Sequence, residues 1–120
     1  MRRTLVALLL FASPAVAASI AGEWIGTGSS KDEKQNFYFV FLQDGTHLNG
    51  SGGSSLYDQN LIQNGKIDGD KISFDIGPGV SNTVMHFNLV ASGTELKGTL
   101  IEKTGQETVS ETVELKKDKT

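Results

Sequence analysis

The sequence predicts an all-β protein, an eight-stranded antiparallel up-and-down meander that closes as a small barrel. Three turn dipeptides, Asp44-Gly45, Asp68-Gly69 and Ser92-Gly93, recur every 24 residues, which is the length of one hairpin with its connections. Between the turns, apolar and polar residues alternate with the period of two that is typical of a strand with one buried face. No apolar stretch has a 3.6-residue period long enough for a helix. Serial tight turns favour a barrel over a two-sheet sandwich.

The turns and the alternation together define eight strands in chain order. We expect them near residues 20–28, 35–43, 46–52, 60–67, 70–76, 83–91, 94–103 and 106–116.

Each turn also predicts the register of its hairpin. If Asp44 and Gly45 are the two turn residues, Phe39 faces Gly50 across the first tight hairpin. The other two turns, treated in the same way, place Leu61 opposite Ile76 and Phe87 opposite Gly98. A glycine lets a small barrel bend, and a ring on the neighbouring strand covers the bare backbone. The five phenylalanines after residue 17 and the single tryptophan, Trp24, fall on the inward side, which is therefore the core.

The N-terminal segment has the features of a secretory signal peptide. Two arginines precede a short apolar run, and Ala15-Val16-Ala17 is a small-x-small cleavage site. The run is too short to span a bilayer, for which about 20 residues are needed. We expect residues 1–17 to be removed on export to the periplasm or the exterior, and residues 18–120 to form a single β-barrel domain. Membrane insertion is not expected.

Composition excludes some classes of function. Both arginines precede residue 17, so the expected mature chain has nine lysines against 14 acidic residues. An acidic surface without arginine disfavours nucleic-acid binding. The chain has no cysteine, so no disulfide stabilises it.

The first expected strand carries Gly22-Glu23-Trp24. This Gly-x-Trp motif, followed by an eight-stranded meander in an exported chain, resembles the calycin superfamily of lipocalins, fatty-acid-binding proteins and avidins. It looks most like short bacterial exported lipocalin-like domains of unknown function. The resemblance covers the mature chain and implies a barrel in which Trp24 packs across the closed end. The chain is shorter than typical lipocalins, has no C-terminal helix or disulfide, and lacks the tryptophans that hold biotin in avidins.

A site is expected at the barrel end opposite the three tight turns. The segment 52–59 is interpreted as a lid over that mouth, and the alternative is that Gly52 to Ser55 form a flexible linker between strands. Bulky inward side chains predict a mostly filled interior with a shallow, largely apolar pocket near the mouth.

Two polar residues, Glu111 and Gln63, interrupt the inward apolar pattern. The expected register places Glu111 opposite Gly98 and Gln63 opposite Phe74. An inward carboxylate needs a hydrogen-bonding or cationic partner, so Glu111 is a candidate ligand-recognition group. A β-bulge that turns Glu111 outward, or a side chain that reaches solvent at the mouth, is the other interpretation. The candidate ligand-binding residues are Leu56, Tyr57, Gln63, Phe74 and Glu111.

Catalytic and metal sites have little support in the sequence. His47 and His86 are expected to face outward on different hairpins, with no carboxylate or nucleophile evident beside them. Asp68-Gly69-Asp70 has too few ligands for a calcium loop and is better explained as a turn. We therefore expect no enzymatic activity, no cofactor and no metal.

An apolar stripe is predicted on the outside of the first two strands. Ile25, Tyr38, Val40 and Leu42 all face outward there, and they mark either a protein partner or homodimer surface or scattered β-branched residues on a solvated sheet. The leading functional hypothesis is an exported, non-enzymatic binding barrel for a small apolar or amphipathic molecule. The alternative is a protein-interaction module with a filled core, such as an envelope inhibitor or assembly factor.

Overall fold

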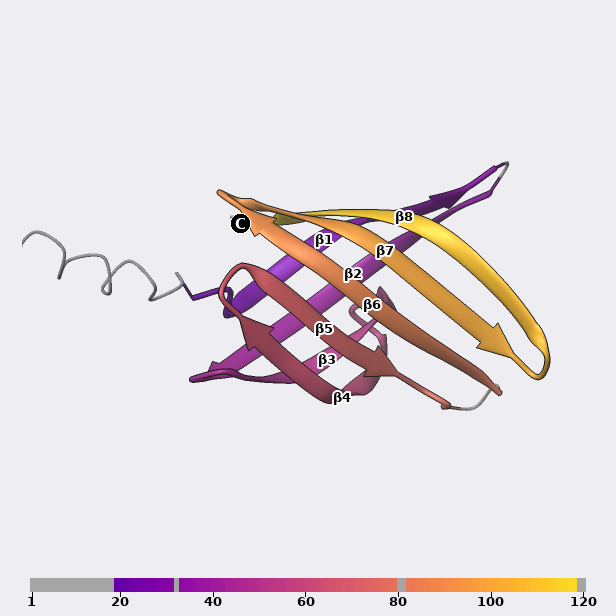
Figure 1. Cartoon of the computed structure of the whole chain (residues 1–120), viewed down its shortest axis with the longest axis horizontal. Helices are drawn as coiled ribbons and strands as arrows, with labels where there is room; N and C mark the ends of the chain where they lie inside the picture. The colour runs from indigo at the N-terminus through magenta and orange to yellow at the C-terminus, as the bar shows by residue number, and fades with distance from the viewer. Residues whose placement is uncertain (1–18, 32, 80–81, 119–120) are drawn as a thin grey trace, which may run out of the picture.

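The computed structural model describes residues 19–31, 33–79 and 82–118, and the expected signal peptide lies outside them. Eight antiparallel strands follow one another around a closed barrel, with β1 paired to both β2 and β8 (Figure 1). The predicted fold class is confirmed. The strands are β1 (Gly22–Ser30), β2 (Glu33–Asp44), β3 (His47–Ser55), β4 (Asp58–Asp68), β5 (Lys71–Ile76), β6 (Thr83–Ser92), β7 (Glu95–Thr104) and β8 (Glu107–Lys117).

The three predicted turns lie together at one end of the barrel, but their register is shifted by two residues. Asp44 pairs with His47, so the turn residues are Gly45 and Thr46 rather than Asp44 and Gly45. Gly45 has a φ of 63°, whereas Thr46 is not among the described residues with positive φ, as in a type II′ turn. Only the glycine then adopts the left-handed conformation, which a residue with a side chain enters at a cost of about 1–2 kcal/mol. Gly69 and Gly93 repeat this arrangement.

The shift changes partners without changing faces. Phe39 lies opposite Gly52 rather than Gly50, and Phe87 lies opposite Leu100 rather than Gly98. Because side chains alternate with a period of two, a two-residue shift leaves every inward residue inward. The prediction that Trp24, Phe39 and Phe87 are nearly inaccessible is therefore confirmed, with 2%, 0% and 0% of their surfaces exposed.

Packed aromatic rings fill the middle of the barrel. Phe39 contacts four other phenylalanines, stacking on Phe41 at 5.3 Å and meeting the edges of Phe74 and Phe87 at 5.5 and 5.4 Å between ring centroids. Phe74 and Phe87 stack on each other at 4.7 Å. The predicted filled interior is thus present, and a site inside the barrel can lie only toward one of its ends.

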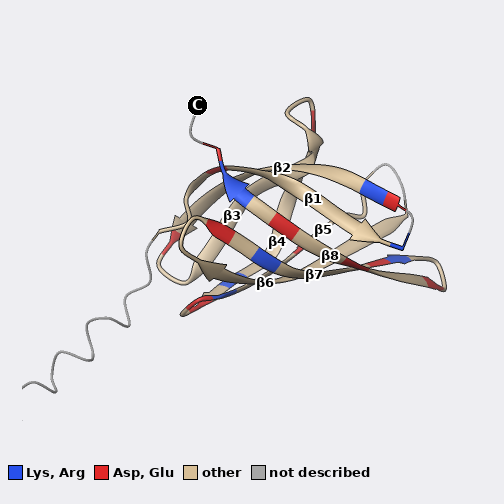
Figure 2. Ribbon diagram, turned by 90° about the horizontal axis from the view of Figure 1, so that it is seen from above, with Lys and Arg blue, Asp and Glu red and all other residues tan. Residues whose placement is uncertain are grey.

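The expected lid at residues 52–59 is instead a tight hairpin. β3 continues to Ser55, β4 begins at Asp58, and Ser55 pairs with Asp58 around a two-residue turn. Neither the lid nor the linker interpretation was correct. The tip of this β3–β4 hairpin bends away from the barrel wall (Figure 2), at a point where the pairing of the two strands is irregular.

A bulge in β4 corrects the predicted orientation of Gln63. The register of β4 on β5 shifts between Gln63 and Lys66, and the intervening Asn64 has a φ of 54°. Before this bulge in the chain, the residues of β4 that the alternation predicts to face inward face outward instead, and their neighbours face inward. Ile62 is therefore buried, while Leu61 is 75% exposed. Gln63 is exposed on the outer face and pairs with Asp75, not with Phe74.

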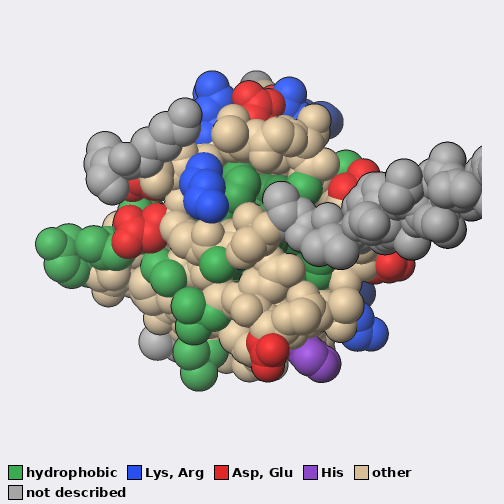
Figure 3. Space-filling model, turned by 90° about the vertical axis from the view of Figure 1, so that its left-hand side faces the viewer, with side chains coloured by type: hydrophobic (Ala, Val, Ile, Leu, Met, Phe, Trp, Pro, Cys, Tyr) green, Lys and Arg blue, Asp and Glu red, His purple; other side chains and the backbone are tan. Residues whose placement is uncertain are grey.

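The N-terminal residues close the turn end of the barrel. Ile20 is buried, and its backbone N–H donates to the Gln43 side chain at 2.9 Å. The Trp24 indole N–H donates to the Ile20 carbonyl at 2.8 Å, and the Lys117 ammonium lies 5.9 Å from the Trp24 ring. Hydrophobic side chains are visible among polar and charged ones on this end (Figure 3). No helix in the described part of the chain is long and apolar enough to cross a membrane.

Candidate functional site

A pocket of about 310 Å³ opens at the barrel end opposite the three glycine turns. Its apolar floor is formed by Phe37, Ile76 and Met85, whose side chains belong to the core or pack against it. Gln35 and Asn60 contribute polar groups to its walls. The pocket differs from the largely apolar one expected, because the inward residues near the strand ends are polar.

Glycines make room for this pocket. Gly79 lies so close to Asn60 that a Cβ on it would be 2.7 Å from the Asn60 Oδ1 atom. A Cβ on Gly52 would lie 2.2 Å from the Phe39 ring and 2.9 Å from Ile76. A side chain at position 52 would displace the Phe39 ring, whereas one at position 79 would move only the end of the Asn60 side chain, so Gly52 is the glycine that keeps the floor in place.

Gln35 lies at the mouth, and its side chain joins β2 to β7 and β8. Its side-chain NH2 group donates to Glu102 Oε2 at 2.6 Å and to both carboxylate oxygens of Glu111, at 3.0 and 2.9 Å. β2 is thereby connected to β7 and β8 over separations of 67 and 76 residues. Gln35 forms a wall shared by the 310 Å³ pocket and a neighbouring one of about 540 Å³ lined by both glutamates.

The neighbouring Glu111 carboxylate affects the ionisation of Glu102. Partial burial, a hydrogen bond with Glu111 and the charges of Glu111 and Glu33 raise the pKa of Glu102, although the Gln35 amide opposes the change. Lys34 also lines the space beside them. Glu102 therefore holds a proton more readily than an isolated carboxyl does.

We expect Glu102→Gln to stabilise the protein at neutral pH by about 0.5–1 kcal/mol, a small value because the group is largely solvent-screened. A carboxyl whose pKa is higher in the folded state than in the unfolded state favours folding at pH values below its unfolded-state pKa. This contribution is lost as the pH rises through its folded-state pKa. The variant should therefore gain most at pH 7 and least at pH 4. Urea unfolding of the wild-type and variant proteins at the two pH values measures the change in the free energy of unfolding. An equal change at pH 7 and pH 4 would contradict the raised pKa of Glu102 as its cause.

The structure places the five predicted site residues in separate locations. Glu111 is half-buried at the mouth, where it pairs with Leu100 rather than Gly98 and takes Gln35 as its partner. Phe74 is fully buried in the aromatic core. The remaining three are exposed, at the β3–β4 hairpin tip or on the outer face of β4: Leu56, Tyr57 and Gln63.

Sequence reasoning missed Gln35 and Glu102, although their signal was present. Gln35 continues the inward series of Phe37, Phe39 and Phe41, and Glu102 continues that of Leu100. The alternation that singled out Glu111 applies equally to these two residues. A polar residue that ends an inward apolar series marks the mouth of a barrel.

A carboxylate does lie beside His86, contrary to the sequence interpretation. Asp75 on β5 pairs with His86 on β6, and their side chains are hydrogen-bonded on the outer face. Burial alone would raise the pKa of Asp75, but hydrogen bonds from His86 and Asn64 outweigh it and lower the pKa. In the described part of the chain, no three or more His, Cys, Asp or Glu side chains are grouped so as to hold a metal ion.

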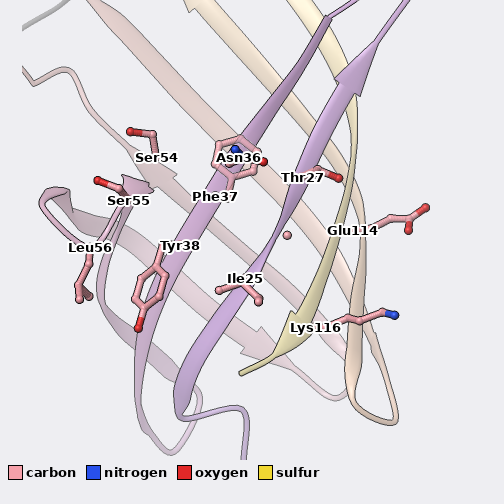
Figure 4. A pocket seen from close by; sticks show the side chains of 11 residues that line it. Ile25, Thr27, Asn36, Phe37, Tyr38, Ser54, Ser55, Leu56, Glu114 and Lys116 are labelled. Atoms are coloured by element: carbon pink, nitrogen blue, oxygen red, sulfur yellow. The ribbon is translucent and has the colours of Figure 1, made fainter. Parts of the chain in front are cut away.

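A second concavity, of about 600 Å³, lies on the outer face beside the bent β3–β4 hairpin (Figure 4). Leu56 of the hairpin lies at one side of this concavity, and Glu114 and Lys116 of β8 lie at the other. Tyr38 of β2 and Ile25 of β1 lie between them. We call it the outer groove. Tyr38 donates a hydrogen bond to Glu23, which raises the pKa of Tyr38 to about 12.

Comparison of the chain with protein-family models, curated proteins and solved structures found no match in any of the three.

Proposed function

We propose that this protein is an exported, non-enzymatic barrel that binds a small amphipathic molecule at its mouth. The observation that carries the proposal is the 310 Å³ pocket, with its floor of Phe37, Ile76 and Met85 beside the Gln35 amide. Ligand pockets typically combine apolar walls with a few placed polar groups, and this volume lies at the small end of their range.

The arrangement of the mouth supports an amphipathic ligand rather than a wholly apolar one. Phe39, Phe41, Phe74 and Phe87 occupy the depth of the barrel, so the bound molecule would rest on the floor and extend toward the opening. Its polar part would then lie next to Gln35, whose NH2 group is held by Glu102 and Glu111 and whose carbonyl oxygen accepts a hydrogen bond. A hydrogen bond in this half-buried position gives orientation as well as affinity.

Export and a relation to calycins are parts of the same proposal. The basic start, short apolar run and small-residue site support removal of residues 1–17. The eight-stranded closed meander and the buried Trp24 in Gly22-x-Trp24 support a lipocalin-like barrel. The alternative function, a protein-interaction module, draws its support from the filled core and the exposed outer groove.

We expect Asn60→Trp to weaken binding of N-phenyl-1-naphthylamine, a neutral amphipathic fluorescent probe, by at least about tenfold. Asn60 lines the pocket, and an indole there would occupy much of the 310 Å³. Probe titration followed by fluorescence measures the affinity. The matched control is Gln63→Trp, on the same strand but exposed on the outer face, which should change the affinity less than about twofold.

A third variant separates the two concavities. Ile25→Lys alters the outer groove and leaves the mouth intact, so it should not affect the probe if the mouth binds it. Loss of binding in Ile25→Lys with none in Asn60→Trp would overturn the proposal and place the probe in the outer groove. Mass spectrometry of molecules that co-purify with the exported protein would then identify the natural ligand.

A further inference from the structure

We propose that the outer groove binds a second copy of this chain, in a two-fold dimer in which each β3–β4 hairpin tip fills the groove of its partner. This inference is independent of ligand binding at the mouth. It rests on three properties of the same face: an apolar groove, an apolar projection beside it, and charges that complement their own two-fold image.

The groove leaves apolar surface in contact with water. Ile25 and Leu56, which both line it, are 43% and 53% exposed. The apolar surface extends beyond it, because Val40 pairs with Ser51 and Ser51 pairs with Leu61, so outward side chains of β2, β3 and β4 form one row. Leu61 is 75% and Leu42 is 58% exposed. Exposed apolar side chains gathered on one face of this kind are typical of an interaction surface.

The projection is the tip of the β3–β4 hairpin. Tyr57 is 95% exposed there, next to Leu56, which itself lines the groove. A tyrosine on a turn is a typical interface anchor, since it contributes a large apolar area with few rotatable bonds.

Hydrogen bonds fix the tip relative to the groove. The Gln59 side-chain amide donates to the Ser55 carbonyl at 2.7 Å and to the Tyr38 carbonyl at 3.0 Å, and its oxygen accepts from Ser51 at 2.6 Å. Ser54 donates to Asp58 at 2.7 Å within the hairpin. Because Tyr38 lines the groove, Gln59 connects the projection directly to the groove wall. Preorganisation of this kind reduces the entropy lost on association.

A projection and a groove that lie side by side on one rigid face are complementary to their own two-fold image. Such isologous pairing is the commonest form of homo-oligomer. The charged residues that line the groove, Glu114 and Lys116, have opposite signs and project from the same strand, as Figure 4 shows. A two-fold axis can therefore place the glutamate of one copy beside the lysine of the other.

Sedimentation velocity over a range of concentrations tests the proposal. The purified wild-type protein should show a monomer–dimer equilibrium, and Tyr57→Asp and Ile25→Lys should each weaken it at least about tenfold. The matched control is Val90→Lys on β6, where the side chain is 46% exposed but lies outside the groove. It should change the dimer dissociation constant less than about twofold.

Charge-reversal variants and disulfide cross-linking test which residues form the interface. Glu114→Lys and Lys116→Glu should each weaken the dimer, and the double variant should restore it. Since the chain has no cysteine, Tyr57→Cys mixed with Thr27→Cys should form a disulfide-linked heterodimer on oxidation, whereas Tyr57→Cys mixed with Val90→Cys should not.

Three outcomes would overturn the proposal. The first is a wild-type protein that stays monomeric at every concentration. The second is a dimer that Tyr57→Asp and Ile25→Lys leave unchanged, which would place the interface elsewhere. The third is a monomer whose outer groove binds N-phenyl-1-naphthylamine and loses that binding in Ile25→Lys, which would make the groove a small-molecule site.

Discussion

Phe39→Ala should lower the free energy of unfolding by about 3–5 kcal/mol, the range for removal of a fully buried phenylalanine. Phe39 is 0% exposed, contacts four other rings, and covers Gly52 on the neighbouring strand. Its loss would leave a cavity in the centre of the barrel, and a bare glycine opposite it. Because small domains are stable by only about 5–15 kcal/mol, this single change removes a large fraction of the total.

Urea unfolding followed by the fluorescence of Trp24, the single tryptophan, measures the loss. Phe39→Leu retains part of the volume and should lose less than the alanine variant. Leu42→Ala on the same strand is the control for an exposed position, since Leu42 is 58% exposed, and it should change stability by less than about 0.5 kcal/mol. A loss below about 1.5 kcal/mol in Phe39→Ala would mean that the aromatic core is loosely packed.

Gly26→Ala should destabilise the protein by about 3 kcal/mol, at the upper end of the range for overpacking. Gly26 lies on β1 opposite Leu115 of β8, in the strand pair that closes the barrel. A Cβ there would lie 1.9 Å from the Glu114 carbonyl oxygen and 2.7 Å from the Leu115 Cα atom. Both are backbone atoms, so rotation of a side chain cannot relieve the contact and the two strands must separate.

The control for this prediction is Gly105→Ala. Gly105 has a φ of 64° but nothing within 4 Å of its would-be Cβ, so its substitution should cost only the left-handed conformation, about 1–2 kcal/mol. Urea unfolding of the two variants separates a steric effect from a conformational one. If Gly26→Ala were the milder of the two, the close approach of β1 to β8 would be wrong.

The local sequence determined most of the architecture. Glycine turns at a 24-residue spacing and strict alternation predict the strands and their order, and the strand ranges agree with the structure to within a few residues. The inward positions of Trp24 and the five phenylalanines also follow from alternation alone. These properties depend on neighbours within one hairpin, so they can be deduced without the rest of the fold.

Register and the bulge in β4 depended on more than the turn dipeptides. Asp-Gly is compatible with a turn that has glycine second as well as with one that has glycine first, and the two choices differ by two residues. The bulge near Asn64 has no comparable sequence signal, yet it reverses the faces of Leu61 and Gln63. Such irregularities arise where a strand must pair with two neighbours at once around a curved wall.

The candidate site was only partly predictable for the same reason. Glu111 was identified from alternation within its strand, and its position at the mouth follows from the strand order. Its partners Gln35 and Glu102 come from β2 and β7, and only barrel closure brings them together. The outer groove likewise exists because the β3–β4 hairpin bends away from the wall next to β1 and β2. The sequence by itself determined which residues face inward and in what order the strands run. Only the tertiary structure decided which inward residues meet, because closure places strands distant in the sequence across a single opening.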